Sequence, residues 1–396
     1  MTPRTNPRSR PRLLHVTTTD MSLDWLLGAQ LRAFAAAGYE VMGVSARTDP
    51  AHADALVAAG IEHVPLVHAT RSVNPREDLA ALRELHGVFR RLRPDIVHTH
   101  NPKPGVYGRL AARAAGVPVI VNTVHGLYAV PEDPWRKRLA VYGLERLAGL
   151  AAQAELLQNP EDLETLAGLG VPRRKLVLLG NGIDLDRFDP AAVDPSVRDR
   201  LRASVGAGPD DIVVGLVGRL VWEKGYREVF AAATQLRRRL PHLRFVVIGP
   251  DDGAKADAVT AADQADATHH GGVTFLGSRT DVHDWYAAMD LYVLASHREG
   301  FPRSAMEAAA MGLPVVTTDV RGCRQVVVHD ETGVLIPVRD PVALAEAVSH
   351  LATRPDARAR LGAAARALAV REFDQQRVID ITLATYERLR ASASSA

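Results

Sequence analysis

The sequence predicts an α/β fold built from two Rossmann-like domains, each a doubly wound parallel sheet covered by helices. Three observations support this prediction. The chain has 396 residues, and domains of roughly 100–200 residues make two domains the natural division. Short β-branched or leucine-rich runs alternate with helical patterns along most of the chain. The alternation stops after residues 177–179 and begins again at residues 212–217, so a hinge is expected between them.

The first alternation supplies strands and helices in turn. The expected strands are residues 13–17, 41–45, 63–67, 95–98 and 119–123. The expected helices are residues 24–37, 51–59, 75–93 and 105–115, followed by one that begins at Pro134. Proline suits a first helical position because no intrahelical partner awaits its missing N–H group.

The second alternation repeats the pattern. The expected strands are residues 212–217, 244–248, 273–276, 291–294 and 315–317, with a helix over 226–240 and three closing helices near 340–352, 356–372 and 375–391. We therefore expect an N-terminal domain over 13–185 and a C-terminal domain over 186–375. Residues 376–396 are expected to pack back on the N-terminal domain as a helix. Residues 1–12, rich in proline and arginine, read as a disordered basic leader.

Composition excludes several classes of function. Lysine plus arginine number 48 against 46 acids, and aromatic residues make up 5%, so neither a nucleic acid nor another polyelectrolyte is expected as partner. The single cysteine, Cys323, excludes an intrachain disulfide and a cysteine-based zinc site. No run approaches the roughly 18–20 apolar residues of a spanning helix, and the apolar run after the leader is too short for a signal peptide. A cytoplasmic protein is expected.

One loop has the residues of a diphosphate site. Neither G-x-G-x-x-G after a strand nor a P-loop occurs in the sequence. Instead, VGRLVWEKG (217–225) begins at a strand end and leads into a helix. Arg219 and Lys224 place two cations near a helix N-terminus, which favours anions. The alternative is an ordinary charged surface loop.

A second loop joins two carboxylates to a helix start. In SHREGFPRSAME (296–307), Glu299 precedes the expected helix and Glu307 lies about one turn inside it. The Gly-Phe-Pro bend between them can aim both at one elongated ligand, and Ser304 is positioned to cap the helix. The alternative is a first-turn acid and a surface glutamate, but a glutamate in an Ala/Met-rich stretch is poorly explained as surface.

These motifs resemble the retaining glycosyltransferases of family 4, which have the GT-B fold of two domains facing across a cleft. The resemblance rests on EGFPRSAMEAAAMGLPVV with its E-x7-E spacing, GRLVWEKG, GNGIDLDRF (180–188), DIVHTH (95–100), NTVHG (122–126) and RTDV (279–282). It covers roughly residues 12–390. A finer match, to enzymes that use UDP-N-acetylhexosamine-type donors in polysaccharide building, rests on QNPEDLETL, GCRQVV and PVRDP.

The resemblance implies a role for each matching residue. Arg219 and Lys224 would hold the donor diphosphate, and Glu299 would accept hydrogen bonds from donor-sugar hydroxyls. The other donor-side positions would be backbone groups at Gly300 and Phe301, Glu307 at the ribose, Arg279 and Thr280 near the base, and His125 facing the sugar across the cleft. The donor is expected to be a UDP-sugar. Same-face attack would retain the anomeric configuration, with the leaving phosphate taking the acceptor proton.

The acceptor is less well defined by the sequence. The loop TTTDMS (17–22) lacks the Gly-Gly pair that many members of this family have, and Ser22, His100 and Asn101 are the acceptor-side candidates. Trp135 followed by three basic residues suggests peripheral contact with an anionic membrane at its inner face; a solvated helix face is the alternative. The acceptor is therefore expected to be either a lipid-linked glycan or a small natural-product aglycone.

Two patterns suggest a metal, and neither is assigned one. Asp184-Leu185-Asp186 matches a D-x-D metal motif, but it follows a Gly-Asn-Gly turn, where Asp184 more naturally caps the chain. His98 and His100 have no third ligand near them in the sequence. No metal or other cofactor is expected. Two rival functions remain open: a nucleotide-sugar epimerase of the same fold, and a non-enzymatic nucleotide-sugar sensor.

Overall fold

The computed structural model describes residues 10–69, 74–100, 103–129, 133–253, 255 and 257–394. It divides into two compact units. Unit 1 contains residues 1–180 and 378–396, and unit 2 contains residues 181–377. The division falls at Gly180, a few residues before the expected one, and helix α14 (Gln375–Ser394) contributes to both units.

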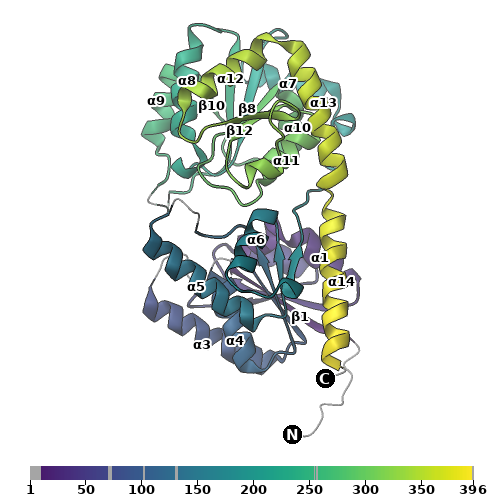
Figure 1. Cartoon of the computed structure of the whole chain (residues 1–396). Helices are drawn as coiled ribbons and strands as arrows, with labels where there is room; N and C mark the ends of the chain where they lie inside the picture. The colour runs from purple at the N-terminus through teal and green to yellow at the C-terminus, as the bar shows by residue number, and fades with distance from the viewer. Residues whose placement is uncertain are drawn as a thin grey trace. The chain divides into compact units, whose positions relative to one another are not determined.

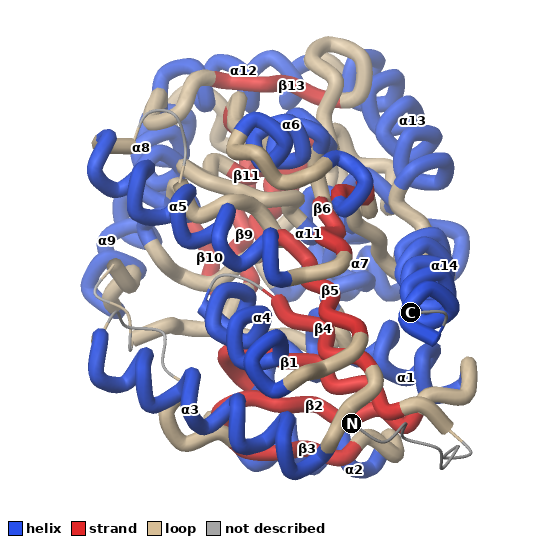
Figure 2. The backbone as a smooth tube through the Cα atoms, turned by 60° about the horizontal axis from the view of Figure 1, so that its bottom comes forward, coloured by secondary structure: helices blue, strands red, loops and turns tan. Residues whose placement is uncertain are grey.

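Unit 1 is built on a seven-stranded parallel sheet with the order β3-β2-β1-β4-β5-β6-β7, of which Figure 2 shows β3, β2, β1, β4 and β5 side by side. The strands are β1 (Arg12–Thr19), β2 (Glu40–Ala46), β3 (Glu62–Pro65), β4 (Ile96–His100), β5 (Val119–Val124), β6 (Ala154–Leu157) and β7 (Leu176–Leu178). The helices are α1 (Gly28–Ala36), α2 (Pro50–Ala58), α3 (Pro75–Leu92), α4 (Lys103–Ala115), α5 (Trp135–Ala151), α6 (Pro160–Gly168) and α14.

Alternation along the strands gives this sheet two buried faces. Leu14 and its neighbours pack with α3 and α4, whereas Leu13 packs with α1, α2 and α14. Helix α14 contributes Val378, Ile379, Tyr386 and Leu389 to this second cluster, and Figures 1 and 2 show it beside α1. Side chains that follow Leu13 at every second position therefore point toward α14.

A buried ion cluster fixes α4 and α5 on the first face. Arg109 of α4 is fully buried, and its guanidinium donates to Glu155 of β6 and Glu145 of α5, each at 2.6 Å. Asn122 of β5 also donates to Glu155, at 2.8 Å. Two carboxylates share one cation here. Burial raises the pKa of Glu155 above its usual value, although the charge of Arg109 acts in the opposite direction. Substitution of Arg109 would leave two buried carboxylates without a cation.

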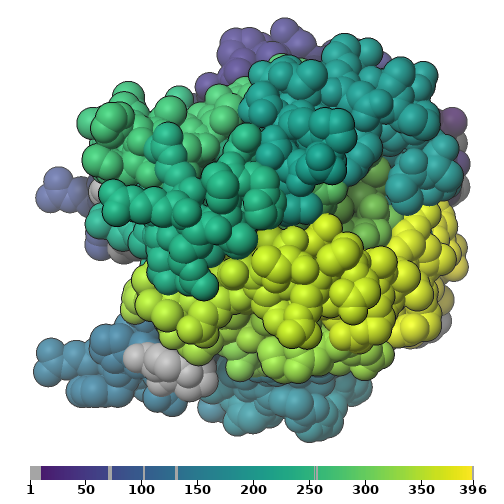
Figure 3. Space-filling view, turned by 90° about the horizontal axis from the view of Figure 1, so that it is seen from above, coloured from purple at the N-terminus to yellow at the C-terminus, as the bar shows by residue number. Residues whose placement is uncertain are grey.

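Unit 2 has a six-stranded parallel sheet with the order β10-β9-β8-β11-β12-β13. Its strands are β8 (Ile212–Val217), β9 (Leu243–Ile248), β10 (Val273–Phe275), β11 (Leu291–Leu294), β12 (Val315–Thr318) and β13 (Gly333–Ile336). Its helices are α7 (Pro195–Ser204), α8 (Tyr226–Arg237), α9 (Ala261–Gly271), α10 (Val282–Ala288), α11 (Arg303–Ala310), α12 (Pro341–Thr353) and α13 (Pro355–Glu372). In Figure 3 the yellow-green surface, which includes α12 and α13, lies next to the teal-to-green surface of the preceding part of unit 2.

Three local expectations need correction. Residues 1–9 of the predicted leader lie outside the described residues, but Arg12 is the first residue of β1, held by Glu40 at 2.9 Å and by the Leu92 carbonyl at 2.9 Å. The expected helix over 24–37 is divided into a π-helical turn, Ser22–Leu26, and α1, which begins at Gly28, a residue that disfavours a helix interior. Strands β6 and β13 were not expected; β6 contains Glu155, which interrupts its apolar run.

Across the described ranges, no helix is both long and apolar enough to cross a membrane.

Candidate active site

The structure brings Lys224 and Glu299 together at one edge of the unit 2 sheet. Their loops follow β8 and β11, which are neighbouring strands. Lys224 Nζ lies 2.5 Å from Glu299 Oε1, and Ser296 Oγ donates to the same oxygen at 2.7 Å. The backbone N–H of His297 donates to the Glu223 carbonyl at 2.9 Å, which fastens the two loops together. Ser296 was missed by the sequence analysis, although it begins the same motif.

Two glycines allow this close approach of backbones. Gly225 has φ +79°, and a Cβ there would lie 2.0 Å from the Ala295 carbonyl oxygen. A Cβ on Gly322 would lie 2.5 Å from the carbonyl oxygen of Glu299. Contacts this short between a Cβ and a backbone oxygen would force a backbone to move. The site is thus shaped by two positions that accept only glycine without movement.

Arg219 lies on the loop of Lys224 but has another partner. Its Nη1 atom lies 2.6 Å from Asp252 Oδ2, in the loop after β9, and the Arg219 side chain is 37% exposed. The Tyr226 hydroxyl donates to the Gly218 carbonyl at 3.0 Å and fixes the start of this loop. Asp252 was not predicted, because nothing in the local sequence links it to Arg219.

Glu307 is held inside unit 2 by partners of its own. The Tyr286 hydroxyl lies 3.0 Å from Glu307 Oε2, and Arg303 Nε lies 3.6 Å from Oε1. Burial raises the pKa of Glu307, against the opposing effects of Arg303 and Tyr286. The expected cap by Ser304 is wrong: Pro302 occupies the N-cap position without a side-chain cap, and α11 begins at Arg303. The Ser304 carbonyl instead accepts from Tyr286, at 3.1 Å.

The remaining unit 2 candidates have structural contacts. The Phe301 carbonyl, next to Gly300, accepts from Asn181 Nδ2 at 3.2 Å. Arg279 pairs with Asp281, two residues along the chain, at 2.6 Å, and the Thr280 carbonyl accepts from Arg187 at 2.9 Å. Asp184 accepts from the Arg187 backbone N–H at 3.1 Å, the turn contact expected for a residue that caps the chain.

In unit 1, His125 belongs to a cluster of histidines. His125 Nε2 lies 2.9 Å from His100 Nδ1, and His100 Nε2 lies 3.0 Å from His15 Nδ1. Burial lowers the pKa of His15 to about 3, and burial, partly offset by a hydrogen bond between His125 and Gln158, lowers the pKa of His125 to about 4. These imidazoles are therefore neutral at physiological pH.

The structure places a third histidine beside His98 and His100. Sequence reasoning found no third ligand for His98 and His100, but His15 of the neighbouring strand brings its ring nitrogen within 4.8 Å of theirs. Residue 15 pairs with residue 98 in the parallel register of β1 and β4. The signal was present: in a doubly wound sheet the first strand lies beside the fourth, so a histidine in each can meet.

The acceptor-side candidates are only partly described. Ser22 opens the π-helical turn after β1, with its Oγ 3.2 Å from Thr19 Oγ1. Asp20 stabilises this loop through the backbone N–H groups of Met21 and Thr48, both at 2.9 Å. His100 is engaged in the histidine cluster, and Asn101 lies outside the described residues.

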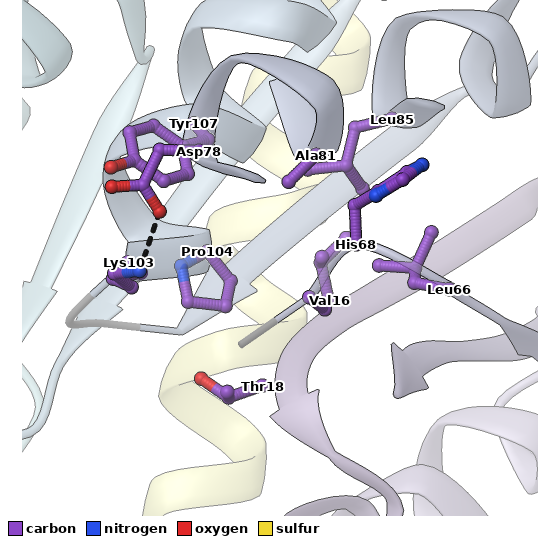
Figure 4. A pocket seen from close by; sticks show the side chains of 11 residues that line it. Val16, Thr18, Leu66, His68, Asp78, Ala81, Leu85, Lys103, Pro104 and Tyr107 are labelled. Atoms are coloured by element: carbon purple, nitrogen blue, oxygen red, sulfur yellow. Dashed lines mark hydrogen bonds and ion pairs between the residues drawn. The ribbon is translucent and has the colours of Figure 1, made fainter. Parts of the chain in front are cut away.

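A largely apolar pocket lies next to this loop in unit 1 (Figure 4). Val16, Leu66 and Leu85 contribute apolar side chains, and its polar edge is formed by Lys103, whose Nζ lies 2.5 Å from Asp78 Oδ1. Tyr107 lies on the same side, and burial together with Asp78 raises its pKa to about 12. Its lining residues come from the carboxyl-terminal half of β1, from α3 and from the segments that follow β3 and β4, at the edge where doubly wound sheets bind ligands.

Comparisons with known proteins identify the family of the chain. The family description "Glycosyltransferase Family 4" matches residues 27–187, and "Glycosyl transferases group 1" matches residues 197–368. The chain is 31% identical over 274 residues to the UDP-Gal:alpha-D-GlcNAc-diphosphoundecaprenol alpha-1,3-galactosyltransferase of Escherichia coli, covering 68% of this chain and 69% of that protein. It is 34% identical over 291 residues to the D-inositol 3-phosphate glycosyltransferase of Xylanimonas cellulosilytica, covering 69% and 67%.

The fold is shared with solved structures. Anabaena Alr3699/HepE, crystallised with UDP and glucose, superposes with a TM-score of 0.79 at 19% identity, over 96% of this chain and 100% of that one. Together with the sequence matches, this likeness confirms the expected GT-B class of two Rossmann-like sheets. The chain belongs to glycosyltransferase family 4, and it is a retaining hexosyltransferase.

Proposed function

We propose that this glycosyltransferase moves a hexose or N-acetylhexosamine from a UDP-sugar to a hydroxyl group of a lipid-linked glycan, with retention at the anomeric carbon. The contact of Lys224 with Glu299 is the observation that carries the proposal. It joins a cation suited to a diphosphate with a carboxylate suited to sugar hydroxyls at one sheet edge. Both contacts of Glu299 named above use Oε1, and in this proposal Oε2 accepts from the donor sugar.

The chemistry needs a stabilised leaving group. The bond between the anomeric carbon and the diphosphate oxygen breaks, the acceptor oxygen bonds to that carbon from the same face, and the acceptor proton passes to the leaving diphosphate. Arg219, Lys224 and the N-terminus of α11 would stabilise the leaving charge, each by about 3 kcal/mol if they resemble oxyanion-hole donors. Protein cations do this in the proposal, without a metal ion. Tyr286 would orient Glu307 toward the ribose, and His125 would contact the sugar.

The exposed face of α5 favours a lipid-linked acceptor over a soluble one. Trp135 and Leu139 are 66% and 67% exposed, and three more leucines on the helix are about half exposed (Leu144, Leu147 and Leu150). Arg136 stacks beside Trp135, with its guanidinium 5.4 Å from the ring centroid. An apolar face bordered by basic side chains fits the interface of an anionic bilayer. The similarity to the E. coli enzyme points to the same acceptor class, and that to the inositol phosphate enzyme points to a soluble one.

Donor chemistry is tested first. UDP-sugars are screened by hydrolysis, and the best donor is then tried with acceptors. Glu299→Gln and Lys224→Ala should abolish transfer while the melting temperature stays near that of the wild type. Glu346→Gln, at an exposed position of α12, is the matched control. Full turnover in both site variants would refute the assignment. Isomerised sugar from donor alone would support an epimerase, and UDP binding without any turnover would support a sensor.

Acceptor class is tested by flotation. The protein should bind vesicles that contain phosphatidylglycerol at low salt and release them at high salt, because each basic residue near such a surface contributes about 1 kcal/mol of screened attraction. Leu139→Ser should weaken binding, whereas Val370→Ser, about half exposed on α13, should not. Transfer to an inositol phosphate with no vesicle binding would favour the soluble acceptor.

A further inference from the structure

On three strands of unit 1, the side chains that face α14 are apolar at first and become polar toward the carboxyl end of the strand. The side chains that follow Leu13 on β1, Ile96 on β4 and Val121 on β5 point toward α14, and each stripe ends in histidine or threonine. These residues are His15, His98, His100, Thr123 and, just beyond β5, His125. In this way four imidazoles gather in a core that is otherwise apolar on the α14 side.

The imidazoles are joined by hydrogen bonds into one chain. His125 bonds to His100 at 2.9 Å, and His100 bonds to His15 at 3.0 Å. His15 Nε2 lies 3.3 Å from the Tyr386 hydroxyl of α14, which also contacts His98 Nδ1. His98 Nε2 ends the chain at Thr123 Oγ1, 2.7 Å away. At its other end His125 bonds to the side chain of Gln158.

Proton counting leaves this chain only two arrangements. A neutral imidazole has one N–H and one acceptor nitrogen, and burial lowers the pKa values of all four rings. Two protons in one gap would repel, and a gap with none would leave two buried lone pairs facing each other. Because the buried Tyr386 hydroxyl must also donate its own proton to one of its two imidazole partners, either all four histidines carry the proton on Nδ1 or all four carry it on Nε2. The Tyr386 hydroxyl donates to His15 in the first arrangement and to His98 in the second.

A bound metal explains the same residues less well. The His98 and His100 rings are stacked with an interplanar angle of 19°, and those of His15 and His100 with 24°. Lone pairs of imidazole lie in the ring plane, so nitrogens on stacked rings do not converge on one ion. The ring nitrogens of these three residues also have hydrogen-bond partners already.

We propose that His15, His98, His100 and Tyr386 form a hydrogen-bonded relay that fixes the tautomer and ring orientation of His125. Tyr386, on the C-terminal helix, is then a positioning residue for sugar transfer. The inference rests on the proposed role of His125 as a donor-sugar contact. Outer partners of this kind set which nitrogen of a histidine bears its proton, and their loss typically lowers the affinity or activity of a metal site about 10–100-fold. We expect the lower end of that range here.

The first test is the tautomeric state of the histidines in the whole protein. Nitrogen-15 NMR of histidine-labelled protein should show one shared tautomer, or one shared ratio, for these four residues. Opposite tautomers at His15 and His100 would overturn the relay. Tight, stoichiometric binding of Zn²⁺ to His15, His98 and His100 in a titration would also overturn it.

The second test breaks the relay at Tyr386. Tyr386→Phe should change the tautomer ratio of His125 and lower kcat about tenfold with little effect on the KM for donor. Tyr39→Phe is the matched control: Tyr39 packs on the Tyr386 ring at 5.8 Å, but its hydroxyl interacts with Arg390 outside the relay. Equal His125 spectra in the two variants would overturn the inference.

A third variant separates this inference from the proposed function. His125→Ala should lower kcat at least as much as Tyr386→Phe does. Unchanged turnover in His125→Ala would refute the role of His125 in transfer, and with it the positioning role of Tyr386. The NMR spectra would still decide whether the hydrogen-bonded chain exists.

Discussion

Acidification from about pH 7.5 to about pH 5 should reduce the free energy of unfolding of unit 1. The cause is the neutral state of its buried histidines. Burial lowers the pKa of His15 to about 3 and that of His125 to about 4, whereas in the unfolded chain histidine has a pKa of about 6.5. Between these values the unfolded chain binds protons that the folded chain does not. The stability is complete above the unfolded pKa and is lost as pH falls toward the folded one.

The size of the loss follows from these pKa values. At about pH 5 each of the two histidines costs about 2 kcal/mol, so together they cost about 4 kcal/mol. Burial also lowers the pKa values of His98 and His100 well below the usual range, which adds to the loss. Whole domains are stable by about 5–15 kcal/mol. The effect is therefore large enough to unfold unit 1 locally under mild acid.

The assay is denaturant unfolding at several pH values, with hydrogen exchange read separately for peptides of β1, β4 and β5. His15→Gln keeps a donor and an acceptor but removes one titration, so the slope of stability against pH should fall by about 1.4 kcal/mol per pH unit. Phe34→Leu is the control: it disturbs packing against the same ring, 5.4 Å away, without removing a proton site. An unchanged slope in His15→Gln would refute the reasoning.

Three further predictions concern stability and nucleotide affinity. Arg109→Met leaves two buried carboxylates without their cation and should cost about 3–5 kcal/mol in denaturant unfolding; a loss below about 1 kcal/mol would contradict the cluster. Gly225→Ala should lower the melting temperature strongly, since its Cβ would overlap a carbonyl oxygen, whereas Gly218→Ala, whose Cβ would approach nothing closer than 3.8 Å, should melt like the wild type. Tyr286→Phe should raise the calorimetric Kd for UDP about fivefold by releasing Glu307; an unchanged Kd would argue against its ribose role.

The fold was largely predictable because parallel sheets leave a strong pattern in a sequence. Each buried strand is a short apolar run and each crossover helix has its own period, so most elements fall close to their expected ranges. The exceptions have physical causes. Strand β6 contains Glu155, whose charge is stabilised by Arg109, distant in sequence, and by Asn122. Nothing within ten residues of Glu155 indicates that partner.

The candidate site was predictable in its residue types but not in its pairings. Lys224 and Glu299 were singled out because cations and carboxylates at strand ends are suited to nucleotide sugars, and their contact follows from the adjacency of β8 and β11. Asp252 and Tyr286 escaped notice, since an acid or a tyrosine in a loop or short helix has no distinctive local pattern. Their importance comes from which side chain they reach, 2.6 Å and 3.0 Å away.

The histidine relay separates what the sequence pattern can predict from what only tertiary packing reveals. Strand order alone brings β1 beside β4, and register alone sets His15 opposite His98, so a reader of the sequence with the sheet order in hand could have joined these two. Tyr386 is different, because it arrives on a helix 288 residues beyond His98 whose docking depends on packing of Phe34, Tyr39 and Leu389. Local pattern selects the residues that can do chemistry, and tertiary packing decides which protons they share.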